Sequence, residues 1–135
     1  RVGCRTYLEQ AGIPWSTVHV AVGHGTTRGG YAAAARLLTD HPWLTGLVCG
    51  NDRMALGAYD AIRAQGLRVR EDVAVIGIDD QELIADQVHP ALTTIALPFE
   101  EMGRVAVSHL LTLMRGGEVP DETLLPGQII RRCSA

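Results

Sequence analysis

The chain has 135 residues, of which 47% are hydrophobic and 20% are charged, and its net charge is −3. This length and composition allow one compact domain that buries about two thirds of its surface. All 12 basic residues are arginines, and they are spread along the sequence without forming a basic block. These features argue against strong binding of a nucleic-acid backbone by this segment, because such binding requires clustered cations.

The cysteines and the first residues indicate the type of compartment. Cys4, Cys49 and Cys133 are odd in number and have no CxxC spacing, which favours a reduced, cytoplasmic protein. No apolar run is long enough for a membrane span, and the first ten residues lack the layout of a secretory signal. The sequence lacks an initiating Met and begins in mid-pattern, so we expect a fragment of a longer protein.

The first 40 residues predict two helices that flank a strand and a loop. Residues 3–11 are expected to form a helix that Gly12 stops, and residues 19–22 (HVAV) a short buried strand. The glycine-rich segment GHGTTRGG, residues 23–30, is expected to be an irregular loop. An Ala- and Leu-rich helix is expected over residues 31–38.

The middle of the chain continues the alternation of strands and helices. A strand is predicted over 46–49 and a helix over 53–65, with Gly66 as its C-terminal cap. The run VAVIGI, residues 73–78, is β-branched and apolar on both faces. Such a strand is typical of a parallel sheet that helices cover on both sides.

The last third of the chain predicts an amphipathic helix and a strand. Pro98 opens the helix, Gly116 and Gly117 end it, and GQIIRRC at 127–133 reads as a strand. Alternating strands and helices predict an α/β fold with an open, mostly parallel sheet and helices on both faces. One face of the Pro98 helix carries an apolar stripe that consists of Met102, Ala106, Leu110 and Leu113.

Two polar doublets follow two of the expected strands. Asn51 and Asp52 follow one strand, and Asp79 and Asp80 follow the next strand along the chain. If these strands are neighbours, about 4.8 Å apart, the doublets flank one crevice at the carboxyl ends, where open α/β sheets bind ligands. Amides and carboxylates there suit the vicinal hydroxyls of a sugar or nucleoside. Asn and Asp are also common helix caps and turn residues, and that interpretation stays open.

Patterns typical of catalysis or metal binding are absent from the sequence. The histidines have no metal-ligand spacing, and an acidic Mg²⁺ site of the receiver type would need a lysine, which the chain lacks. Residues 23–30 do not match a phosphate-binding loop, and no serine lies in a GxSxG elbow. We therefore expect no enzyme, no metal and no cofactor. Of the histidines, only His24 lies near the expected mouth of the crevice.

Several motifs in fixed order resemble the C-terminal half of LacI/GalR-family transcription regulators. They are GLVCGNDRMALGAYDAIRAQGLRVREDVAVIGIDD, then HPALTTIALPFEEMGRVAVSHLLTLMRGG, then LLPGQIIRRCSA. The resemblance takes in almost the whole chain. Its specificity lies in the order and spacing of the motifs rather than in any one of them.

The resemblance implies a two-lobed, periplasmic-binding-protein-like effector domain preceded by a helix-turn-helix headpiece that is absent here. It assigns residues 1–95 and 123–135 to the C-terminal lobe, and residues 96–122 to a crossover and a helix that normally belong to the N-terminal lobe. The apolar stripe of this helix would then lack its usual partner. We expect the helix to fold onto the C-terminal lobe, to pair with another chain, or to be poorly ordered.

Site residues follow from the resemblance position by position. Asn51 matches the asparagine of the family's ND motif, Asp79 the first acid of GxDD, and Phe99 an aromatic residue that lines the cleft; all three look like effector contacts. From the residues alone, core packing is the favoured role of Phe99 and stacking on a sugar ring is the alternative. In this comparison Asp52 becomes the expected cap of the helix over 53–65.

The chain departs from the family pattern at three places. Leu97 stands where relatives often have a Gln, and Gly25 stands where they often have an aromatic residue. Arg1 lies one place away from a family arginine that contacts the effector. Arg1 and His24 complete our set of candidate effector-binding residues.

The implied function is the sensing of a small, sugar-like effector by a dimeric transcription regulator or repressor that binds operator DNA through its headpiece. The first alternative is a periplasmic sugar-binding protein of a transport system, and the second is an α/β enzyme that acts on sugars. Neither reading calls for a membrane partner.

Overall fold

A computed structural model describes residues 2–135 and contains most of the helices and strands that the sequence predicts. The strands at 46–48 and 74–79 and the helix at 52–64 lie within one residue of their expected positions, and the strand expected over 127–133 is limited to 128–130. The helices are α1 (Val2–Gln10), α2 (Thr27–Asp40), α3 (Asp52–Ala64) and α4 (Phe99–Met114), with a short 3₁₀ turn, η1 (Trp15–Thr17); the strands are β1 (Gly46–Val48), β2 (Ala74–Asp79), β3 (Thr93–Ala96) and β4 (Gln128–Ile130).

The four strands form one sheet in the order β1-β2-β3-β4. Strands β1, β2 and β3 are parallel, and β4 runs antiparallel to β3 at the far edge. The prediction of an open, mostly parallel sheet is confirmed. Strands β1 and β2 are neighbours, with Leu47 opposite Val75, as the hypothesis of a single crevice requires.

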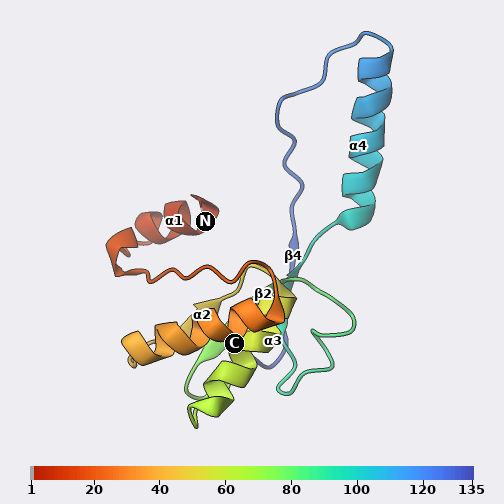
Figure 1. Cartoon of the computed structure of the whole chain (residues 1–135). Coiled ribbons are helices and arrows are strands. Elements are labelled where there is room, and N and C mark those ends of the chain that lie inside the picture. The colour runs from red at the N-terminus through yellow and green to blue at the C-terminus, as the bar shows by residue number, and fades with distance from the viewer. Residues whose placement is uncertain (1) are drawn as a thin grey trace.

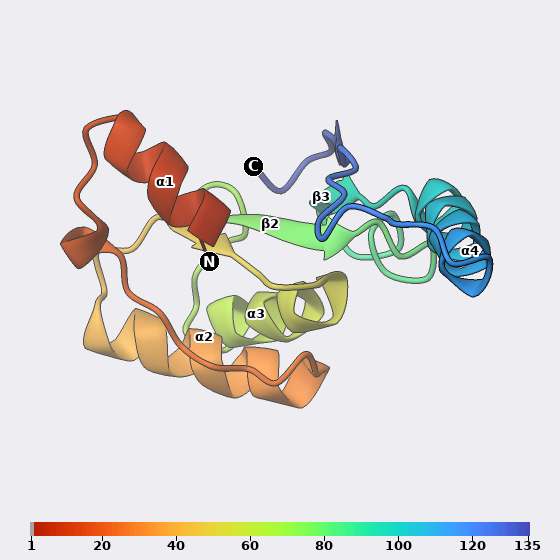
Figure 2. The same cartoon turned by 90° about the horizontal axis from the view of Figure 1, so that it is seen from above.

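Helices lie on both sides of the sheet (Figure 2), with α2 and α3 on one side of β2 and α1 on the other. The core lies between α3 and the sheet, where Tyr59, Ile62, Val75 and Leu92 are fully buried. Burial of each such side chain stabilises the fold by about 1.5–3 kcal/mol. The buried hydroxyl of Tyr59 is satisfied because it donates a hydrogen bond to the carbonyl of Pro90 at 2.9 Å.

Gly66 terminates helix α3, as predicted. Gly66 follows the C-cap residue Gln65 and has φ +74°, a conformation that glycine adopts without strain. Its N–H donates to the carbonyl of Arg63 at 2.9 Å, and the N–H of Leu67 donates to that of Ile62 at 3.1 Å. These two bonds are the Schellman pattern that terminates many helices.

Helix α2 begins at Thr27, inside the segment 23–30 that its glycine content marks as a loop. The prediction of an irregular loop is therefore wrong for residues 27–30. The reason is close packing of two helices. A Cβ atom at Gly30 would lie 2.3 Å from a backbone oxygen of α3, and one at Gly57 would lie 2.0 Å from the backbone oxygen of Thr27. Glycine at these positions lets α2 and α3 touch through their backbones.

Residues 19–22 form no strand, and that prediction is wrong. Among the described residues, no strand hydrogen-bonds to this segment, since β1 pairs with β2 alone. Val20 and Val22 are exposed rather than buried. Apolar, β-branched composition predicts a strand only where a neighbouring strand can complete the hydrogen bonds.

Helix α4 stands apart from the sheet and from the other helices (Figure 1). None of its residues is buried, so folding onto the sheet, one of the three outcomes expected for this helix, does not occur. Residues 115–127 then return to β4 without helix or strand. The exposed large apolar side chains of α4 are Phe99, Met102, Val107, Leu110, Leu111, Leu113 and Met114.

Candidate functional site

The carboxyl ends of β1 and β2 bring the two polar doublets to the same edge of the sheet. Val48 pairs with Ile76, and the N–H of Cys49 donates to the carbonyl of Ile76 at 2.8 Å. Asn51 follows Val48 by three residues, and Asp79 follows Ile76 by three. Because ligands of open α/β sheets bind beyond the carboxyl ends of the strands, this edge is the candidate site.

Asn51 connects the start of α3 to the glycine-rich loop. Its Oδ1 accepts from the N–H of Met54 at 2.9 Å, and its Nδ2 donates to the carbonyl of Gly25 at 3.1 Å. His24, exposed and with φ +51°, lies in the same loop, so the structure brings His24 and Asn51 to one place. An amide has two hydrogens and two lone pairs, so half-buried Asn51 keeps one of each for a ligand.

Asp52 is not the helix cap. Asn51 occupies the N-cap position, and Asp52 is the first residue of the helix itself, with no exposed surface. Its Oδ1 accepts from the Thr94 hydroxyl at 2.6 Å and its Oδ2 from the N–H of Gln81 at 2.7 Å. Burial raises the pKa of the Asp52 carboxyl, and these two hydrogen bonds act in the opposite direction. Asp52 therefore holds α3, β3 and the turn after β2 together.

The second doublet is also divided between two roles. Asp79 and Asp80 both have positive φ, +115° and +54°, which is rare for residues with side chains. Asp80 forms an ion pair with Arg132 at 2.8 Å. Asp79 accepts from the Nε2 of Gln81 at 3.0 Å through Oδ2, and its Oδ1 accepts from no group in residues 2–135. Asp79 is thus the acid of the doublet that is free to take a hydroxyl.

Three of these partners, Gln81, Thr94 and Arg132, are not predicted from the sequence. Gln81 is two residues from Asp79, but Thr94 and Arg132 are 42 and 52 positions from the acids they bind. Only the order of the strands brings them together. The TTI motif that contains Thr94 marks the segment, yet no spacing within it indicates a partner for Asp52.

Phe99 begins α4, just past the end of β3, and is 60% exposed. Core packing, the role favoured from the residues alone, is therefore wrong. The ring lines a recess of about 670 Å³ formed by residues 97–101 and Arg104. Neither Asn51 nor Asp79 lines this recess, so the structure does not bring Phe99 together with them. Arg1 lies outside the described residues.

Chemistry other than ligand binding has little support at this edge. Burial raises the pKa of the Cys49 thiol to about 12, so it stays protonated and is a poor nucleophile. Within the part of the chain that the structure describes, no group of three or more His, Cys, Asp or Glu side chains could hold a metal ion.

The described residues contain no helix with the length and apolar character needed to span a membrane.

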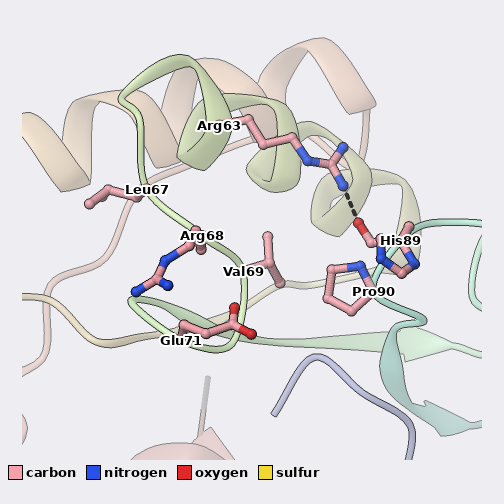
Figure 3. A pocket seen from close by; sticks show the side chains of 7 residues that line it. All are labelled: Arg63, Leu67, Arg68, Val69, Glu71, His89 and Pro90. Atoms are coloured by element: carbon pink, nitrogen blue, oxygen red, sulfur yellow. Dashed lines mark hydrogen bonds between the residues drawn. The ribbon is translucent and has the colours of Figure 1, made fainter.

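A second recess, of about 280 Å³, lies at the opposite, amino-terminal edge of the sheet (Figure 3). Both of its arginines are already engaged. Arg63 donates to the carbonyl of His89, and Arg68 forms an ion pair with Asp72 at 2.9 Å. Glu71 adds a negative charge to the wall. This recess offers no unpaired arginine to an anionic ligand and is separate from the candidate site.

An open α/β sheet with polar groups at its carboxyl edge is the arrangement of ligand-binding domains of the periplasmic-binding-protein type. The chain belongs to the family of periplasmic binding protein-like domains, which matches it over residues 1–135. The resemblance to LacI/GalR-type regulators is also confirmed. The sucrose operon repressor of Escherichia coli is 39% identical over 109 residues, which are 77% of this chain and 32% of the repressor.

Two solved structures extend the comparison to the fold. The lac repressor dimer bound to operator and the anti-inducer ONPF has a TM-score of 0.87 and 34% identity, over 98% of this chain and 39% of that one. The complex of the transcriptional regulator CelR with cellobiose has a TM-score of 0.89 and 34% identity, over 98% and 41%. The chain thus spans roughly a third to two fifths of these proteins.

Proposed function

We propose that this chain is the effector-sensing part of a LacI/GalR-type transcription regulator, and that its effector is a small sugar or sugar derivative. The observation that carries the proposal is the edge with Asn51 and Asp79, where an amide and a carboxylate oxygen are free to bind adjacent hydroxyls. His24 is a further proposed contact, and Phe99 and Arg1 are proposed as contacts from the family resemblance alone. The likeness to a sucrose operon repressor and to a regulator in complex with cellobiose supports a sugar.

The proposed mechanism is a change in the arrangement of two lobes. Residues 1–95 and 123–135 form one lobe, and residues 96–122 cross to the other, which lies outside this chain. The exposed apolar side chains of α4 support this division, because they suit burial against a further domain. An effector between the lobes shifts their balance only by its different affinity for the two arrangements.

The regulator acts as a homodimer in the cytoplasm and binds operator DNA through a headpiece that precedes this chain. The structure of a lac repressor dimer on its operator supports this part of the proposal. The protein has no enzymatic role in this account, in agreement with relatives that are transcription regulators.

A thermal-shift screen of the full-length protein tests the proposal, with sucrose, lactose, cellobiose, a nucleoside and a sugar phosphate as probes. We expect one sugar to raise the melting temperature and to change affinity for operator DNA. Asn51→Ser keeps a cap on α3 but removes the amide, and Asp79→Asn removes the charge. Asp79→Asn should weaken binding of that sugar about tenfold or more, since a hydrogen bond to a charged group contributes about 1.5–3 kcal/mol. Asn51→Ser should weaken it about two- to tenfold, since a hydrogen bond between neutral groups contributes about 0.5–1.5 kcal/mol.

Asp60→Asn is the matched control, because Asp60 is an exposed carboxylate of α3 away from the sheet edge. It should leave sugar binding unchanged. If both site variants bind the sugar like the wild type, the site is misplaced. A protein that binds the sugar without any effect on operator DNA would support the transport alternative, and conversion of the sugar to a product would support an enzyme.

A further inference from the structure

The buried carboxylate of Asp52 touches three parts of the fold that meet at the candidate site. It starts α3, accepts from Thr94 of β3 at 2.6 Å, and accepts from the N–H of Gln81, beyond β2, at 2.7 Å. A Cβ atom on Gly77 would lie 2.1 Å from Oδ1 of Asp52, so β2 runs directly against the carboxylate.

The turn that Asp52 binds is the one that presents Asp79. Asp79 and Asp80 both have positive φ, and residues with side chains rarely adopt this conformation without support from their surroundings. Asp52 binds the backbone of Gln81, the residue that follows them. The side chain of Gln81 in turn donates to Oδ2 of Asp79 at 3.0 Å. A continuous chain of hydrogen bonds therefore runs from Asp52 through Gln81 to Asp79.

Only a carboxylate can accept from both donors, the Thr94 hydroxyl and the N–H of Gln81. Both oxygens of Asp52 accept a hydrogen bond, whereas an amide has one acceptor oxygen and would turn an N–H₂ donor toward a second donor. Burial raises the pKa of Asp52, and the nearby Asp79 and Asp80 raise it further. A buried acid surrounded by like charges is unfavourable for the fold alone, which indicates a role beyond packing.

We propose that Asp52 is a positioning residue of the effector site: it fixes the turn at 79–81 and thereby directs the carboxylate of Asp79 into the crevice. Asp52 has no exposed surface and acts on the effector only through Asp79. This inference rests on the proposed function for its biological meaning. The geometry of the turn, however, is open to measurement without any effector.

Amide hydrogen exchange and NMR on the full-length protein without sugar test the inference. In Asp52→Asn the amide of Gln81 should exchange at least about tenfold faster, while the amide of Val75 keeps its wild-type rate. Gly77→Ala, which displaces the carboxylate but leaves its charge, should have the same local effect. In the wild type the Gln81 amide proton should titrate with Asp52, and this titration should be absent in Asp52→Asn. Asp60→Asn should change none of these quantities.

Unchanged exchange at Gln81 in a folded Asp52→Asn protein would overturn the inference. A parallel acceleration at Val75 and Gln81 would also overturn it, because Asp52 would then serve stability alone. If Asp52→Asn fails to fold, Gly77→Ala supplies the second test, and unchanged exchange at Gln81 in that variant would also overturn the inference. A sugar screen without a hit alongside the expected Gln81 response would contradict the proposed function and leave the positioning role in place.

Discussion

Helices α3 and α4 are similar in length, 13 and 16 residues, and both carry an apolar stripe, yet their surroundings are opposite. Tyr59 and Ile62 of α3 are fully buried between α2 and the sheet, whereas α4 buries no residue. An apolar stripe thus gives a buried core helix where the chain supplies a surface to pack against, and a projecting helix where it does not. Amphipathicity predicts that a helix needs a partner, and it does not say where the partner is.

The largest difference between the two helices is expected when a glycine of each is replaced by alanine. Gly57→Ala should lower the free energy of unfolding of the 135-residue chain by about 3 kcal/mol, because the new Cβ would lie 2.0 Å from the carbonyl oxygen of Thr27. Gly103→Ala is the matched change on α4, where the new Cβ would meet no atom within 4 Å other than those of its own helix backbone. It should increase the helical circular dichroism signal, since alanine favours a helix over glycine by about 1 kcal/mol.

Urea unfolding followed by tryptophan fluorescence and by circular dichroism distinguishes the two effects. The core transition should move for Gly57→Ala and stay in place for Gly103→Ala. A core transition that moves equally for both variants would show that α4 packs on the core in solution.

A smaller contrast between α3 and α4 is expected in how their stability depends on pH. The pKa of Asp52 in α3 is raised above its ordinary value of 3.8, mainly by burial, so the stability it contributes is fully present below 3.8 and is lost as the pH rises through the folded value. Glu101 of α4 behaves in the opposite way. Its pKa is lowered below 4.5 by the Arg104 guanidinium, so its contribution is present above 4.5 and is lost as the pH falls.

Unfolding and helicity measured between about pH 2 and pH 8 test these signs. The stability of the wild type relative to Asp52→Asn should fall as the pH rises. The helicity of the wild type relative to Glu101→Gln should fall as the pH drops, and by a small amount, because the pair is exposed to solvent. A constant difference between wild type and Asp52→Asn across this range would contradict the raised pKa of Asp52.

Much of the sheet and of α3 can be predicted from the sequence, because local patterns determine them. The run VAVIGI, the apolar period of α3 and the stop at Gly66 need no knowledge of distant residues. Gly30 is different. The glycine content around it indicates a loop, but the close approach of α2 to α3 accommodates it in a helix, and this contact is visible only in three dimensions.

The site divides in the same way. The position of the two doublets after two strands predicts the polar edge, and neighbouring strands β1 and β2 place both doublets there. The roles within each doublet cannot be read in this way. Asn51 and Asp52 are both good caps, and a shift of one residue decides which of them caps α3. Asp52 is buried because Thr94 and Gln81 reach it from other segments.

We propose that the effector binds at the carboxyl edge of the sheet, beside Asn51 and Asp79. Amide hydrogen exchange of the full-length protein, with and without the sugar that gives the largest thermal shift, tests it most directly. Sugar binding should slow exchange in residues 23–26 and 79–81 and leave it unchanged in residues 67–71 of the opposite recess. Protection of residues 67–71 with unchanged exchange at 23–26 and 79–81 would contradict it.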